Sequence, residues 1–151
     1  FIGALTATGH SARCDSSCYE CLRQYRNMNY HGLLDWRLGM GLLRILCSDS
    51  TRGGSDGNLQ TPELEGWLER ARFLRDSFAL SFGGRSQDFG RLPGCCVGRK
   101  QVIFIHPLWD CAQPSELLTE AIHATDRGIP IRFLDTFNVM RRPSYSYQSL
   151  M

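Results

Sequence analysis

The sequence predicts an α/β fold, in which a small cysteine-rich helical module is followed by a small α/β domain with a short, mainly parallel sheet. Three cysteines lie within eight residues near the start of the chain, and the polar segment Ser48–Thr61 contains no aliphatic residue except Leu59. Two short apolar runs after that segment flank a helical pattern. We therefore expect a module over residues 1–47, a linker over 48–61 and an α/β domain over 62–151.

The composition is close to that of an average globular chain. Of the 151 residues, 42% are hydrophobic and 21% are charged, which excludes wholesale disorder and a fibrous repeat. No apolar run approaches the ~18–20 residues needed to span a bilayer, so we expect a cytoplasmic protein without a membrane partner. The chain begins at Phe1 rather than at a methionine, and we expect it to be a piece of a longer protein.

The module contains one long helical segment. The stretch Leu33–Leu46 is rich in large apolar residues and has no proline, which predicts a helix with more than one face buried. Within it we expect Trp36 in the core. Asp35 and Arg37 could form a buried ion pair or a lock onto another domain.

The α/β domain is expected to open with a helix. Thr61 is a suitable cap and Pro62 a suitable first helical residue. Large apolar residues then recur at steps of three and four as far as Phe78, so one stripe of this helix should face a core. The pair Gly83–Gly84 ends the pattern.

A strand, a helix and a second strand follow. Lys100–His106 and Ile131–Leu134 are short apolar runs typical of buried strands, and Ser115–Arg127 between them is a capped helical segment. This order predicts a right-handed βαβ unit with parallel strands. Asp135–Arg142 is expected as a short helix that ends before Pro143.

The chemistry-bearing motif lies in the module. His10, Cys14, Cys18 and Cys21 form the pattern H-x3-C-x3-C-x2-C, whose spacing is typical of a tetrahedral zinc site. His31, or a residue upstream of the chain, is the alternative fourth ligand. The seven cysteines are odd in number, which argues against a closed set of disulfides. Four protein ligands would make the Zn²⁺ structural rather than catalytic, since a catalytic zinc keeps one position open.

Basic and aromatic residues follow the cysteines directly. Their mixture suits phosphates and stacked bases, and the candidate nucleic-acid-binding residues are Arg23, Tyr25, Arg26 and Tyr30. Alternatively, the tyrosines pack over the metal knuckle and Asn27 caps the next helix. The formal net charge of +2 is too small on its own to indicate a nucleic-acid partner, and zinc on three thiolates would lower it to +1.

The stretch from His10 to Arg44 is distinctive as a string. With CDSSCYECLRQYRN followed by YHGLLDWRLG, it resembles the cysteine-rich zinc-binding domain near the C-terminal end of certain superfamily-two helicases. The bacterial forms in phage-defence systems of the DISARM kind are most similar, and a shorter version occurs in MrfA-type repair helicases. The resemblance implies that Cys14, Cys18 and Cys21 are zinc ligands. The repair helicases usually supply four cysteines, so the absence of a fourth nearby cysteine here is a departure.

These observations lead to a functional expectation. We expect a non-catalytic zinc-binding module of a helicase, or of a helicase partner, in bacterial antiviral defence, which assists DNA binding or subunit docking. The chain has no G-x4-G-K-[ST] loop and no Asp-Glu pair, so it does not hydrolyse ATP by that route. The motor would lie upstream or in a separate subunit, and no small-molecule substrate is expected.

A metal-dependent nuclease on the C-terminal sheet is the alternative. Nuclease patterns are missing around the strands, because Gly98 stands two residues before Lys100, the only lysine of the chain. His106, Asp110 and Asp135 nevertheless follow the predicted strands, where open α/β sheets place their ligands. They could converge as a site, although we favour a role in bracing turns.

Overall fold

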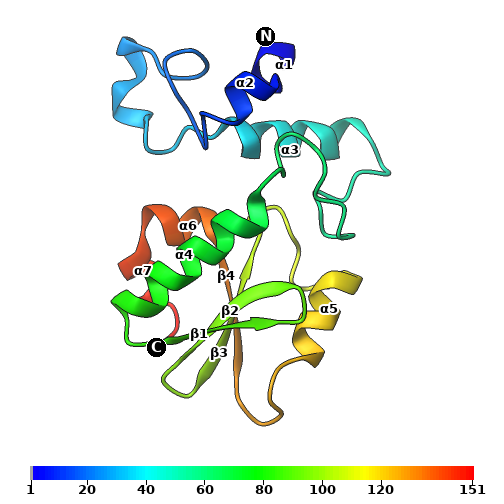
Figure 1. Ribbon diagram of the computed structural model, residues 1–151, viewed down its shortest axis with the longest axis vertical. Helices are drawn as coiled ribbons and strands as arrows, with labels where there is room; N and C mark the ends of the chain where they lie inside the picture. The colour runs from blue at the N-terminus through cyan, green and yellow to red at the C-terminus, as the bar shows by residue number, and fades with distance from the viewer. Residues whose placement is uncertain (1) are drawn as a thin grey trace. The chain divides into compact units, whose positions relative to one another are not determined.

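The computed structural model describes Ile2–Met151, which divide into two compact units (Figure 1). The first unit comprises the residues up to Gly54 together with Asn58–Glu65, and the second comprises Ser55–Gly57 and Gly66–Met151. Most of the segment expected as a linker is therefore built into the first unit. Among the described helices, none combines the length and apolarity needed to cross a membrane.

The first unit is helical and small. Its elements are α1 (Ile2–Leu5), α2 (Thr8–Ser11), the 3₁₀ helix η1 (Tyr25–Tyr30) and α3 (Trp36–Cys47). Cysteines make up much of its core. The buried members are Leu5, Cys14, Trp36 and Met40, and the partly buried Cys18, Cys21 and Leu22 pack against them. So few apolar side chains bury little surface, and units of this size commonly need a metal or disulfides.

Helix α3 is capped by Asp35, whose carboxylate accepts a hydrogen bond of 3.0 Å from the backbone N–H of Leu38. The cap makes the helix start three residues later than the apolar run predicts. Only one face is buried, and Leu42, Leu43 and Leu46 are exposed. The expectation of more than one buried face is therefore wrong for this structure, because the core of the first unit takes only the Trp36 side of the helix.

Arg37 ties α3 to the chain around it. Its guanidinium donates to three carbonyl oxygens, those of Asp15 (3.2 Å), Pro62 (2.7 Å) and Ser11 (2.6 Å). Its Cζ also lies 4.6 Å from the centre of the Trp36 ring. Burial lowers the pKa of this arginine, and the three carbonyl contacts satisfy the buried donors. Arg37 thus acts as a lock within its own unit.

The second unit contains four helices and four strands. Its elements are α4 (Trp67–Ser81), β1 (Arg85–Phe89), β2 (Leu92–Val97), β3 (Lys100–Ile105), α5 (Glu116–His123), β4 (Ile131–Asp135), α6 (Thr136–Arg141) and α7 (Pro143–Gln148). The expected start of α4 at Pro62 is wrong, because Gly66 has a φ of +67° that no continuous helix allows. Pro143 ends α6 as expected and also begins α7.

The four strands form one mixed sheet in the order β1-β2-β3-β4. The α/β class is confirmed, and β3 and β4 are parallel as the βαβ pattern predicts. The expectation of a mainly parallel sheet is wrong, because β1, β2 and β3 pair antiparallel. Two Gly-Arg turns make these hairpins, Gly90–Arg91 and Gly98–Arg99, and both glycines have a positive φ. Apolar patterning does not predict β1, because β1 is a polar, mostly exposed edge strand.

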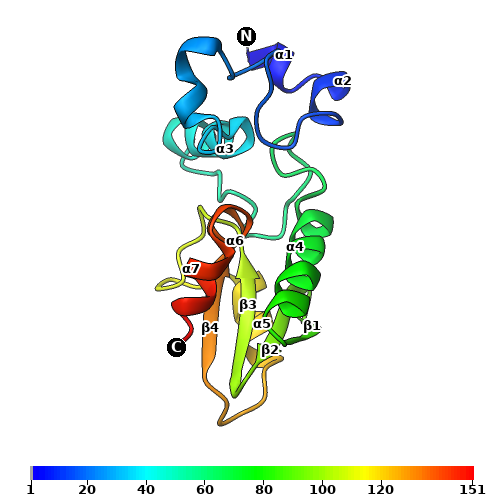
Figure 2. The same ribbon diagram turned by 90° about the vertical axis from the view of Figure 1, so that its left-hand side faces the viewer.

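Helices cover both faces of this sheet (Figures 1 and 2). On one face α4, α6 and the C-terminal residues pack through a shared core that includes Phe78, Phe104, Leu134 and Val139. Helix α5 lies on the other face, against β1 and β2 (Figure 2). Because β3 and β4 are parallel, their C-terminal ends lie at the same edge of the sheet, and Asp135 at the end of β4 caps α6.

Asp135 is a helix cap. Its carboxylate accepts hydrogen bonds of 2.8 Å from both the backbone N–H and the side-chain amide of Asn138. We predict that Asp135→Ala lowers the free energy of unfolding of the second unit by about 0.5–2 kcal/mol, the usual value of such a cap. Urea denaturation measures the loss. Asp135→Asn keeps an acceptor and should lose less; equal losses would show that the cap is not the cause.

Candidate metal centre

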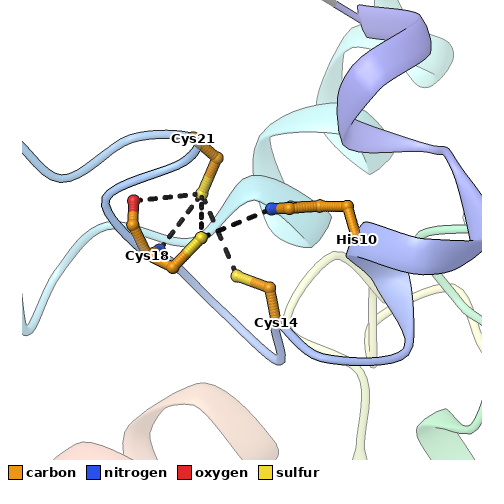
Figure 3. Close-up of side chains that lie close together, drawn as sticks. All are labelled: His10, Cys14, Cys18 and Cys21. Carbon is orange, nitrogen blue, oxygen red and sulfur yellow. Dashed lines mark hydrogen bonds between the residues drawn. The ribbon is translucent and has the colours of Figure 1, made fainter.

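Four side chains from a short stretch of the first unit converge on one point (Figure 3). His10 comes from α2, Cys14 from the turn after it, and Cys18 and Cys21 from the loop that leads to η1. One potential ligand atom of each residue lies within 4.8 Å of all the others. These residues therefore form a group that could hold a metal ion, and each belongs to the predicted motif.

Hydrogen bonding sets the tautomer of His10. Its Nδ1 lies 2.9 Å from the carbonyl oxygen of Leu5, which can only accept, so Nδ1 carries the proton. The other ring nitrogen, Nε2, points at the Cys18 Sγ, 3.5 Å away. The ring is buried and packs against Trp36, with 5.5 Å between the ring centres. A metal-ligating histidine usually donates its other ring N–H to a carbonyl oxygen in this way, which leaves Nε2 as the ligand atom.

The environment acts differently on the thiols. Burial raises the pKa of Cys14 to about 12. Burial also opposes the Cys18 thiolate, but hydrogen bonds, led by those from His10 and from the backbone of Glu20, outweigh it and lower the pKa to about 7. The Cys21 sulfur accepts a hydrogen bond of 3.1 Å from the backbone N–H of Cys18. Such N–H donors favour thiolates, which are the form that binds metals.

Helix α3 braces the ligand loop. The indole N–H of Trp36 donates to the carbonyl of Cys14 at 2.9 Å, and the backbone N–H of Trp36 donates to Ser16 at 2.8 Å. Because Trp36 is only 2% exposed, these bonds are protected from water. Trp36 thus links the ligand loop to α3, although the two segments are about twenty residues apart in the sequence.

His31, the alternative fourth ligand, lies elsewhere. Its Nε2 is 2.9 Å from the Asn27 Oδ1 and 3.1 Å from the carbonyl oxygen of Gln24. Asn27 also accepts from the backbone N–H of Gln24 and donates to Leu22, so it closes its own turn. The suggestion that Asn27 caps the following helix is therefore wrong, and His31 is outside the metal group.

The predicted nucleic-acid residues lie in and just before η1. Tyr25 is 87% exposed and Tyr30 is 60% exposed, so neither packs over the knuckle. Arg26 is exposed and Arg23 is half-buried. The Nε of Arg23 donates to the hydroxyl of Ser17 at 2.9 Å. The four residues therefore leave two aromatic rings and one guanidinium open to solvent.

The candidate residues at the sheet edge are engaged in local contacts. His106 is buried, accepts from the backbone N–H of Leu108, and has its pKa lowered to about 4 by burial. Asp110 accepts from the backbone N–H of Ala112 at 2.8 Å. With Asp135 in the cap of α6, these residues brace turns. Within Ile2–Met151 they do not appear in any group of three or more metal-binding side chains.

A cavity beside the metal group has no signal in the sequence. It has a volume of about 320 Å³ and is lined by His10, Arg13, Cys14, Cys18, Tyr19 and Glu20. Three of these residues belong to the metal group, so the group is reached from solvent on this side. Spacing predicts the ligands because they are close in sequence, whereas the cavity depends on how Arg13, Tyr19 and Glu20 fold around them.

No protein-family model, curated protein or solved structure matches this chain. The chemistry of the four converging side chains is therefore the main guide to its function.

We predict that the first unit depends on its bound metal. Cys18→Ser removes one thiolate, and because Cys18 packs against the core of this unit, metal loss and unfolding should occur together. Elemental analysis and circular dichroism measure the two effects. Cys47→Ser, which changes an exposed cysteine outside the group, is the matched control and should alter neither.

Metal affinity should fall as the pH falls. The thiol of Cys14, with a pKa of about 12, must release its proton to bind a metal near neutral pH. Each proton released lowers the apparent affinity about tenfold per pH unit of acidification. The fall should steepen below about pH 7, where Cys18 is also protonated. Competition with a chelator of known pH dependence measures this slope; a flat profile would contradict thiolate ligation.

Proposed function

We propose that His10, Cys14, Cys18 and Cys21 hold one structural Zn²⁺ that organises a nucleic-acid-binding module. The observation that carries the proposal is the spacing of the donor atoms. A tetrahedral zinc with bonds of about 2.3 Å to sulfur and 2.0–2.1 Å to nitrogen separates two sulfurs by about 3.8 Å, and sulfur from nitrogen by about 3.6 Å.

Three of the donor-atom distances are close to those separations, and all four donor atoms lie within 4.8 Å of one another. The sulfur of Cys21 lies 3.6 Å from that of Cys18 and 3.9 Å from that of Cys14, and the Nε2 of His10 lies 3.5 Å from Cys18. Three sulfurs and one imidazole suit zinc better than magnesium or calcium, which prefer oxygen ligands. When bound, zinc would supply four cross-links within the unit and no reaction.

The ligand set favours a structural role. Four protein ligands fill a tetrahedral zinc, so no position is left for an activated water. Cys14 is buried in the small core, with Cys18 and Cys21 packed against it. Since unfolded chains hold no preformed site, the free energy of metal binding becomes free energy of folding for this unit.

The exposed face of η1 supports a nucleic-acid partner. Tyr25 and Tyr30 present their rings to solvent, where each can stack on an unpaired base. Arg26 beside them can contact phosphate, and its Nε is held by the Gln24 side chain at 2.7 Å. We therefore propose single-stranded DNA as the partner, with protein docking as the outcome if binding fails.

The resemblance of His10–Arg44 to helicase zinc domains supports a wider context. We propose that the module works beside a helicase motor, located upstream or in another subunit, in bacterial antiviral defence. The chain lacks a phosphate-binding loop of its own, so the module would hold DNA while the motor moves it.

The salt dependence of binding tests the DNA contact. If Arg23 and Arg26 each contact a phosphate, replacing both with alanine should flatten the slope of log affinity against log salt by about 1.4, at about 0.7 per contact with single strands. Fluorescence anisotropy with a labelled oligonucleotide measures the slope.

The matched control is the double variant Arg99→Ala and Arg127→Ala, which removes two exposed arginines from the second unit. It should leave the slope unchanged. Equal slopes for all three proteins, or no binding to DNA at low salt, would reject the nucleic-acid face and favour docking to a protein.

A further inference from the structure

Two of the three cysteines of the metal group line the cavity beside it, and Cys18 is the more exposed of these two. Cys18 and Cys14 line it, whereas Cys21 does not. Cys14 is only 4% exposed, and Cys18 is half-buried. A water molecule occupies about 30 Å³ of liquid, so a cavity of about 320 Å³ admits a small oxidant such as hydrogen peroxide next to Cys18.

A positively charged side chain, that of Arg13, lies at the same cavity. Arg13 lines it, and its Nε is fixed by the carbonyl of Gly9 at 2.7 Å. Glu20 lies 3.5 Å from the guanidinium, although both side chains are largely exposed and the pair is weak. A guanidinium at this position favours the negative charge that develops on oxygen when a thiolate cleaves a peroxide bond.

A second sulfur is within reach of the first. The Sγ of Cys21 lies 3.6 Å from that of Cys18, and only two residues separate them in the chain. Oxidised cysteines condense with a neighbouring thiol to give a disulfide. The geometry therefore provides a sulfur at the cavity and a resolving sulfur in one loop.

We propose that Cys18 is a peroxide-reactive site, and that its oxidation forms a disulfide with Cys21 and releases the metal. The Cys18 thiolate attacks one peroxide oxygen, the O–O bond breaks, and one proton converts the leaving hydroxide to water. The Cys21 thiolate then attacks the sulfur of the sulfenic acid, and a second proton releases a second water. Two thiolates are oxidised, and one hydrogen peroxide is reduced to two waters.

Metal release follows from the ligand count. The disulfide removes two of the four donors, and the remaining Cys14 and His10 cannot complete a tetrahedron. The inference rests on the proposed zinc site and adds its regulation. Because the same cysteines belong to the core of the first unit, oxidation would loosen the module and withdraw its partner-binding face.

The experiment treats the zinc-loaded full chain with hydrogen peroxide and follows released zinc with a chromogenic chelator. Trapping with dimedone, then mass spectrometry, identifies the first cysteine oxidised. We expect Cys18 to be trapped first, and zinc release to match formation of the Cys18–Cys21 disulfide. First oxidation at Cys14, or at the exposed Cys47 with zinc retained, would overturn the proposal.

A pair of variants tests the cavity itself without altering a ligand. Arg13→Gln should slow zinc release several-fold, whereas Arg52→Gln, which changes an exposed arginine of the same unit that does not line the cavity, should not. Equal rates would remove the role of Arg13. A chain purified without zinc would reject the zinc site and this inference together, whereas zinc that stays bound in peroxide would reject only this inference.

Discussion

The convergence of three sulfurs and one imidazole nitrogen is the constraint on which the first unit depends. Three thiolates at these distances would repel one another, and burial raises the pKa of the Cys14 thiol, so all three sulfurs could carry charge together only with a cation between them. The apolar core around them is small, with Leu5, Trp36 and Met40 as its buried members besides Cys14. On the proposed metal site, metal binding would therefore be coupled to the folding of this unit.

Buried hydrogen bonds connect the four converging side chains to the rest of the unit. The Leu5 carbonyl fixes the ring of His10, and the Trp36 indole fixes the loop of Cys14. Arg37 then joins Ser11 and Asp15 to Pro62. Each contact links a ligand-bearing segment to a different part of the chain, so a change at the metal would reach α3 and the segment after it.

Local features of the structure could be predicted from the sequence, and tertiary ones could not. The ligands lie within twelve residues, and the caps Asp135 and Ser115 act three residues away, so spacing reveals them. Strand β1 was missed because it is polar, and β2 was missed because Pro93 and Gly94 interrupt its apolar run. The exposed face of α3 was missed because an apolar run does not show what covers it. The cavity also arises only once the loop is folded.

X-ray absorption at the zinc edge of the purified chain tests the central claim most directly. We expect one zinc per chain, bound by three sulfurs at about 2.3 Å and one nitrogen at about 2.0–2.1 Å. A shell with fewer sulfurs, or with an oxygen in place of the imidazole, would contradict the account. A chain that binds no zinc at all would contradict it entirely.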